Sequence, residues 1–132
     1  MKIAVCISGQ PRNYKQGFAE LKKWFLSKYD CDIYIHTWKD DSAMEAGHKF
    51  AQARTYEFED DDYSKILDLF KPKDYFFQKP IPFDTTNIKG TPLNYKLNSL
   101  LSASYSIHAC YNLVRNSGIE YDLIIRTRFD LE

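Results

Sequence analysis

The sequence predicts an α/β fold with a mostly parallel sheet of about four strands and helices on both of its faces. Short apolar segments alternate with amphipathic segments, in the order strand, helix, strand, helix, strand, helix, strand. Such alternation is typical of parallel strands joined by right-handed crossovers. The chain has 132 residues, of which 44% are hydrophobic, so we expect one domain, residues 1–132, around one core.

The four predicted strands are short and rich in β-branched and aromatic residues. They cover residues 3–7, 33–38, 74–78 and 121–128. The first apolar run is too short for a signal peptide or a spanning helix, and Gly9 and Pro11 follow it at once. We therefore expect no membrane span.

Three helices are predicted where apolar residues recur at three- and four-residue spacing. They cover residues 15–29, 62–70 and 95–116. Asp62 is expected to cap the second helix, Pro72 to stop it, and Gly118 to close the third. The buried side of the third helix is predicted to consist of Leu97, Leu100, Leu101, Ser104, Tyr105, Ile107, His108, Tyr111 and Val114.

Two segments show no regular pattern. Residues 39–61 are rich in charge and predict a loop with a weak helical stretch at 43–54. Residues 79–94 contain three prolines and Gly90, which predicts an extended connector. Connectors of this length in compact domains are often functional.

Charge and cysteine content narrow the possible partners and location. Lys and Arg total 18 and Asp and Glu total 18, so no overall field attracts nucleic acid or an anionic membrane. The cysteines are odd in number and lack metal-ligand spacing: Cys6, Cys31 and Cys110. Free thiols in a reducing compartment are the simplest interpretation, and we expect a cytoplasmic protein that binds no nucleic acid.

Polar residues follow each predicted strand. The first strand ends in Ser8-Gly9-Gln10-Pro11-Arg12 and the last in Arg126-Thr127-Arg128-Phe129-Asp130. In open parallel sheets, ligands bind beyond the carboxyl ends of the strands, where the strand order reverses. If the first and last strands pair, the two clusters become neighbours and form one polar site.

The first cluster suits a phosphate group. Gly9 allows the backbone to approach a ligand, Ser8 and Gln10 offer hydrogen bonds, and Arg12 provides a planar fork of donors. A solvated turn with a surface arginine is the alternative. Neither a G-x-G-x-x-G loop nor a G-x-x-x-x-G-K-[ST] loop is present, so a dehydrogenase or a P-loop hydrolase is not expected.

The last cluster places charge where an apolar residue would be expected. Arg126 and Arg128 lie two residues apart and so face the same side of the strand. They need acidic partners or an anionic ligand. Asp130 can pair with them or hold a divalent cation, with Glu132 two residues further on. A purely structural Arg–Asp network is the alternative.

Other candidates are less specific. His36 ends an apolar strand and suits either a site residue or a satisfied structural histidine. His108 is expected in the core, His48 falls in the irregular loop, and three scattered histidines do not form a zinc site. Trp38 suits packing better than stacking on a base.

Three segments together resemble a known family: Lys2–Arg12 (KIAVCISGQPR), Tyr34–Trp38 (YIHTW) and Tyr121–Leu131 (YDLIIRTRFDL). They are similar to the amino-terminal half of bacterial and viral glycosyltransferase-like proteins with a GT-A-like nucleotide-diphospho-sugar transferase fold, a Rossmann-like three-layer sandwich. The last segment resembles their Arg-x-Arg-x-Asp, which occupies the place of the Asp-x-Asp metal and diphosphate motif. Leu100–Ser106 resembles their helix that lines the donor pocket.

The resemblance implies glycosyl transfer from a UDP- or GDP-linked sugar to a hydroxyl of a glycan or another acceptor. It implies a catalytic role for Asp130, and metal ligation of Mn²⁺ or Mg²⁺ by Asp130 and Glu132. The residues implied to bind the nucleotide and its phosphates are Ser8, Gly9, Gln10, Arg12, His36, Arg126 and Arg128. Asp130-Leu131-Glu132 departs from Asp-x-Asp, and complete transferases of this fold continue into an acceptor-binding half. We therefore expect donor recognition rather than turnover by this chain alone.

Two other functions remain open at this point. One is a catalytically silent module that binds a nucleotide or a protein, and the other is a metal-dependent phosphate-processing hydrolase that uses Asp130. The final strand, if exposed, also offers an edge for self-association into a homo-oligomer.

Overall fold

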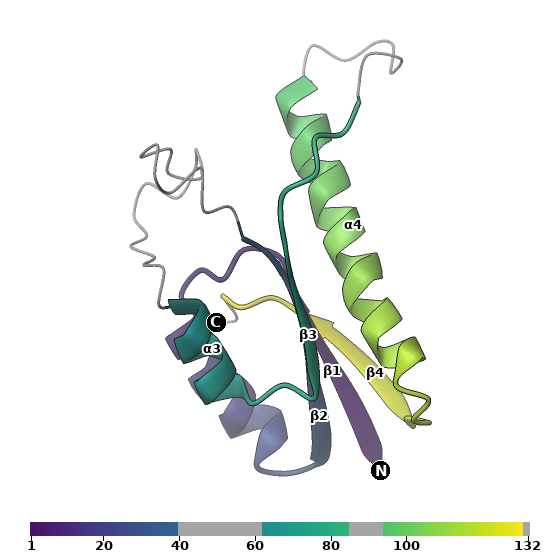
Figure 1. The fold of residues 1–132 in the computed structure, drawn as a ribbon. Coiled ribbons are helices and arrows are strands. Elements are labelled where there is room, and N and C mark those ends of the chain that lie inside the picture. Colours follow the sequence, from purple (N-terminus) through teal and green to yellow (C-terminus); the bar gives the residue numbers. More distant parts are fainter. Residues whose placement is uncertain (40–61, 85–93, 131–132) are drawn as a thin grey trace.

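A four-stranded parallel sheet forms the centre of the computed structural model, which describes residues 1–39, 62–84 and 94–130. The strand order is β3-β2-β1-β4 (Figure 1). The bounds are β1 Lys2–Ser8, β2 Asp30–Trp38, β3 Asp74–Gln78 and β4 Leu123–Thr127. The predicted sheet is confirmed, although β2 begins earlier and β4 is shorter than the sequence pattern suggested.

Helices cover both faces of the sheet, as predicted. Helix α1 (Tyr14–Leu21) continues into the π-helical turn η1 (Lys22–Leu26), and this pair shares one face with α3 (Asp62–Phe70). Helix α4 (Asn94–Asn116) lies on the other face (Figure 1). The order β3-β2-β1-β4 corresponds to the first four strands of the Rossmann arrangement. The fold is thus a Rossmann-like three-layer α/β sandwich.

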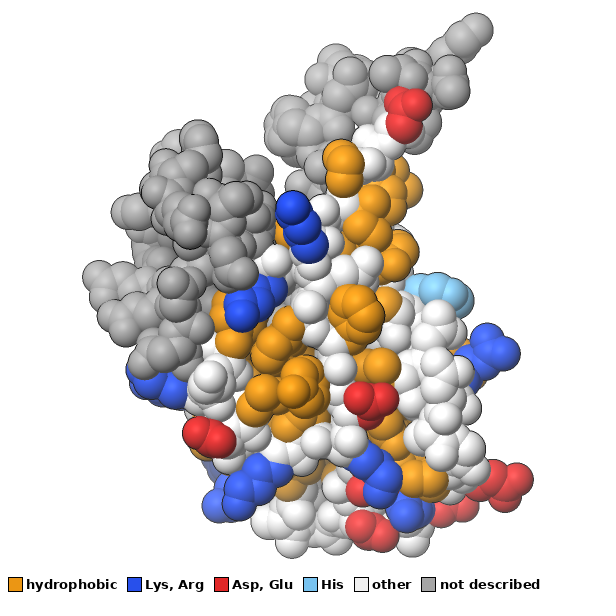
Figure 2. Space-filling model, viewed as in Figure 1, with side chains coloured by type: hydrophobic (Ala, Val, Ile, Leu, Met, Phe, Trp, Pro, Cys, Tyr) orange, Lys and Arg blue, Asp and Glu red, His pale blue; other side chains and the backbone are white. Residues whose placement is uncertain are grey.

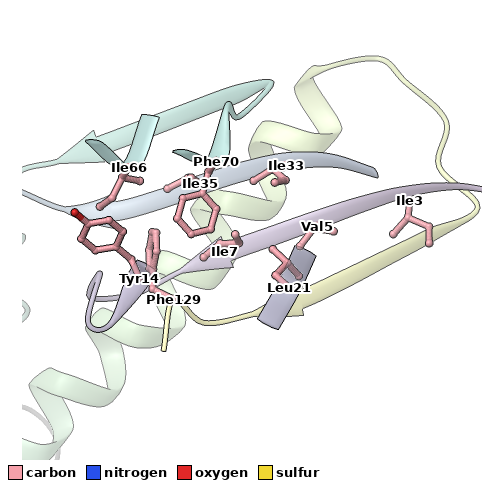
Figure 3. Close-up of a cluster of buried hydrophobic side chains, with 10 residues drawn as sticks. All are labelled: Ile3, Val5, Ile7, Tyr14, Leu21, Ile33, Ile35, Ile66, Phe70 and Phe129. Carbon is pink, nitrogen blue, oxygen red and sulfur yellow. The ribbon is translucent and has the colours of Figure 1, made fainter. Parts of the chain in front are cut away.

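The larger core lies between the sheet and the α1–α3 layer (Figure 3). Alternate strand residues point to this side because side chains in a strand have a period of two. Its buried members are Ile3, Val5, Ile7, Tyr14, Leu21, Ile33, Ile35, Ile66, Phe70 and Phe129. Asp62, the expected cap, begins α3 and accepts a hydrogen bond from the Tyr14 hydroxyl.

The opposite face of the sheet packs against α4. Ala4 and Cys6 of β1 and Tyr34 of β2 contact Cys110 and Val114 of the helix. Small side chains on the central strand let a helix approach the sheet closely.

The buried side of α4 was predicted wrongly. Among the α4 side chains that the structure describes, Ser106, Cys110 and Val114 are buried, and of the nine predicted positions only Val114 is one of these. His108 is exposed rather than in the core, and Leu100 is 62% exposed. The first turns of α4 extend past the carboxyl ends of the strands, where no sheet lies beneath them (Figure 1).

The sheet has two edge strands, β3 and β4. Tyr75 and Phe76 on β3, and Leu123 and Ile124 on β4, are between 41% and 48% exposed. Figure 2 shows hydrophobic side chains gathered on the β3 side of the molecule. Self-association through the edge of β4 stays a prediction.

Several predictions fall outside the described residues: the weak helix at 43–54, His48, most of the 79–94 connector and Glu132. All three cysteines are free, as expected. Among the helices that the structure describes, none combines the length and the apolar character needed to cross a membrane.

Candidate functional site

The pairing of β1 with β4 brings the two polar clusters together. Cys6 lies beside Arg126 and Ile7 beside Thr127, so the residues after each strand emerge at the same end of the sheet. A crevice of about 580 Å³ lies here, between the strand ends and the first half of α4. Its lining consists of Ser8, Gly9, Gln10, Arg12, Trp38, Pro80, Ser99, Ser102, Ala103, Ile107, Arg126 and Arg128.

This crevice lies where the strand order reverses. The chain moves outward from β1 to β2 and β3, and α4 then carries it back across the sheet to β4 on the other side of β1. Connections that leave in opposite directions open a gap above the strands, which is where ligands bind in folds of this class. The predicted location of the site therefore agrees with the topology.

A second, more open cleft of about 850 Å³ lies at the amino end of β2, beside η1 and the end of α3. It carries lysines and aspartates together, and Lys73 approaches Asp32 at 3.6 Å. Opposite charges that neutralise one another leave little local field for a charged ligand. The smaller crevice is the better candidate because its charge is of one sign.

Gly9 forms the turn at the floor of the crevice. Its φ of +103° is a conformation that side-chain-bearing residues rarely adopt, while a Cβ there would meet no atom within 4 Å. The Gly9 N–H donates to Ser106 Oγ at 3.1 Å and to the His36 carbonyl at 3.3 Å. Thr37 Oγ1 donates to the Gly9 carbonyl at 2.6 Å. The backbone of this glycine is thus bound within the protein, and ligand contacts at this turn come from the neighbouring side chains.

His36 supports that turn from below. Its ring is fully buried, with Nδ1 at 2.6 Å from Ser106 Oγ and Nε2 at 2.9 Å from Gln78 Oε1. Gln78 uses its amide nitrogen to donate to the Tyr105 hydroxyl at 3.1 Å, so its oxygen faces His36. We therefore assign the proton to Nε2, with Nδ1 accepting from the Ser106 hydroxyl.

The surroundings of His36 favour the neutral ring. Aromatic rings of Trp38, Phe76 and Tyr105 pack around it. Burial lowers the pKa of His36 below its usual value, and the hydrogen bond to Gln78 opposes this shift only in part. His36 does not line the crevice, and its described contacts suit the structural role that we considered as the alternative. Its contact with a nucleotide stays a prediction.

Sequence reasoning missed Ser106 and Gln78. Ser106 has no exposed surface and repeats at four-residue spacing with Cys110 and Val114, which is the small-residue stripe that faces the sheet. A polar residue in such a stripe requires a buried partner, and this is the signal that could have identified it.

Phe129 anchors the end of β4. Its side chain is only 1% exposed and meets the Phe70 ring edge-on, with ring centroids 5.7 Å apart. Arg128, which precedes it, is exposed and lines the crevice.

Three arginines give the crevice its positive charge. Arg12 donates from Nε to Gln10 Oε1 at 2.8 Å, and its Nη2 donates to the same oxygen. Arg128 Nη2 lies 2.9 Å from Asp130 Oδ2. Arg126 makes no hydrogen bond or ion pair with any residue that the structure describes. One of the three arginines thus has a carboxylate partner among the described residues.

The predicted metal ligands do not assemble into a metal site within the described ranges. Asp130 is engaged by Arg128, and Glu132 lies outside those ranges. No group of three or more His, Cys, Asp or Glu side chains in 1–39, 62–84 and 94–130 could hold a metal ion. The Arg–Asp pair that we considered as a structural alternative is present for Arg128.

Trp38 completes the wall of the crevice. It is 7% exposed, and its ring centroid lies 5.5 Å from that of Tyr105. Packing, the role expected from sequence, accounts for most of its surface.

Comparison with known proteins gives no match to a protein family, to a curated protein or to a solved structure. The function is therefore argued from the crevice itself.

Proposed function

We propose that the crevice binds a nucleotide-diphospho-sugar and that the protein serves glycosyl transfer to a hydroxyl acceptor as its donor-binding part. One observation carries this proposal. Arginines from two strand ends far apart in sequence converge on one crevice that has no acidic residue in its described lining. Clustered guanidinium groups of this kind suit phosphate oxygens.

The size and shape of the crevice agree with such a ligand. Its volume of about 580 Å³ lies within the range of small-molecule sites. Hydroxyls of Ser8 and Ser102 and the apolar side chains of Ile107 and Trp38 line it beside the arginines. A diphosphate beside the guanidinium groups would leave these surfaces for the sugar and the nucleoside.

In the proposed reaction, the arginines act on the leaving group. Cleavage of the sugar–phosphate bond leaves negative charge on the diphosphate, and fixed positive groups lower the energy of that state. Arg12, Arg126 and Arg128 fill this role. We give Asp130 the role of orienting Arg128, because its carboxylate already holds that guanidinium.

Isothermal titration calorimetry with UDP, GDP and their sugar conjugates tests the proposal. Binding is expected for at least one of them, and Arg126→Ala should weaken it by about 1–3 kcal/mol, the usual contribution of a charge-assisted hydrogen bond. Arg115→Ala is the matched control, since Arg115 is an exposed arginine in the last turn of α4.

The same experiment distinguishes the alternatives. Absence of binding to all of these nucleotides contradicts the proposal. Binding without sugar transfer to any acceptor favours a catalytically silent module, and release of inorganic phosphate favours a hydrolase.

A further inference from the structure

We infer that this crevice neutralises its ligand with arginine alone, so that binding of the nucleotide diphosphate needs no divalent cation. The inference rests on the proposed function and concerns how the same site works. It departs from the expectation that Asp130 and Glu132 hold Mn²⁺ or Mg²⁺.

The carboxylate that would hold a cation is already occupied. Asp130 Oδ2 lies 2.9 Å from Arg128 Nη2, which is the length of a charge-assisted hydrogen bond. A divalent ion bound to this oxygen would compete with the guanidinium for it. It would also lie close to the positive charge of Arg128, and like charges repel.

The other residues that line the crevice provide few ligands for a divalent cation. Mg²⁺ and Mn²⁺ prefer hard oxygen ligands, above all carboxylates. The described residues that line the crevice contain hydroxyls and one side-chain amide but no Asp or Glu. The donor set therefore suits an anion better than a cation.

The arginines also match the ligand in charge and geometry. Arg12, Arg126 and Arg128 against the single carboxylate of Asp130 leave two positive charges uncompensated among the described residues. The diphosphate bridge of a nucleotide sugar carries about two negative charges near neutral pH, since each phosphate retains one acidic oxygen. No metal is needed to balance this pair.

The guanidinium of Arg12 is oriented by Gln10. Gln10 binds its Nε and Nη2 and so fixes the plane of the guanidinium, while Nη1 is not used in that contact. Arg126 lies on β4 beside Cys6, and Arg128 directly follows that strand. The phosphates would thus be held from two sides, and the donors of Arg12 are directed in advance.

Calorimetric titration of the full chain with UDP, GDP and their sugar conjugates, in EDTA and in MnCl₂, tests the inference. We expect the same Kd in both buffers within about twofold, and a Kd that rises with salt concentration. Binding only in MnCl₂, or binding about tenfold tighter there, overturns the inference and leaves the proposed function intact. Absence of binding in both buffers rejects the proposed function, and the inference with it.

Two variants sharpen the result. Asp130→Asn removes the carboxylate that a metal would require and that orients Arg128. Under arginine-only neutralisation, its effect on the Kd is the same in EDTA and in MnCl₂, and a larger loss of affinity in MnCl₂ than in EDTA contradicts the inference. Arg126→Lys keeps the charge but loses the planar fork, and we expect its Kd to rise about tenfold in EDTA and MnCl₂ alike.

Discussion

At the scale of the residue, Gly9 and the side chains beneath it set the shape of the crevice floor. Gly9 is required for its positive φ and not for lack of space, and its peptide group is held by Ser106, His36 and Thr37. These buried partners are all satisfied among the described residues, where no buried side-chain nitrogen or oxygen lacks a hydrogen bond. A floor of this kind is rigid, because each group that could rotate has a fixed partner.

Gly9→Ala and Gly118→Ala form a matched pair of substitutions. Both glycines have positive φ, +103° and +69°, and both have open space around the Cβ position. Each change is expected to lower the free energy of unfolding by about 1–2 kcal/mol, because alanine is strained at positive φ. Gly9→Ala should also weaken UDP or GDP binding, while Gly118→Ala should not. Urea denaturation and calorimetry measure the two effects, and equal loss of affinity in both variants would show that the turn at Gly9 has no special part in binding.

At the scale of the element, α4 shows where sequence patterns succeed and where they fail. The existence of the helix and its end before Gly118 follow from spacing and from the capping glycine. The buried side of α4 does not follow from the spacing of its apolar residues. The sheet beneath the helix presents Ala4 and Cys6, and small side chains such as Ser106 and Cys110 fit against that surface. The larger apolar residues of the helix therefore point elsewhere, and hydrophobic periodicity alone identified the wrong side.

Val114→Ala and Leu100→Ala test which side of α4 is buried. Val114 is 3% exposed and packs on the sheet, whereas Leu100 is 62% exposed. Truncation of Val114 should lower the free energy of unfolding by about 1–3 kcal/mol, and truncation of Leu100 by less than about 0.5 kcal/mol. Chemical denaturation provides both values. A larger loss for Leu100 than for Val114 would contradict the helix orientation described above.

At the strand ends, unlike on α4, the sequence pattern predicted which residues lie together. Arg126 and Arg128 at two-residue spacing predicted one charged face, and the alternation of strands and helices predicted a parallel sheet. The meeting of the two clusters was predicted on the condition that the first and last strands pair, and the structure shows that pairing. The hydrogen bonds of His36 could not be predicted in this way, because the sequence does not reveal that Ser106 and Gln78 meet its two ring nitrogens.

At the scale of the whole molecule, the buried neutral histidine links stability to pH. The folded pKa of His36 is lowered by burial, so the unfolded chain takes up a proton first as the pH falls through 6.5, its ordinary value. The free energy of unfolding should be insensitive to His36 above that pH and should decrease below it, by at most about 1.4 kcal/mol per pH unit.

Urea denaturation between about pH 7.5 and pH 5 measures this dependence, within the range where histidine titrates. His36→Gln should reduce the slope of unfolding free energy against pH, whatever its effect on absolute stability. An unaltered slope in His36→Gln would exclude His36 as its source.

The central position of β1 has a consequence for how the molecule forms. Its two neighbours come from distant parts of the chain, and the backbone N–H of Lys2 at its start donates to the Asp122 carboxylate across a separation of 120 residues. Contacts of such separation form late, because the entropy of closing a long loop must be overcome first. On the ribosome, one side of β1 stays unpaired until β4 has been synthesised. Strand β4 also carries Arg126, so the four-stranded sheet and the proposed anion site form in the same step.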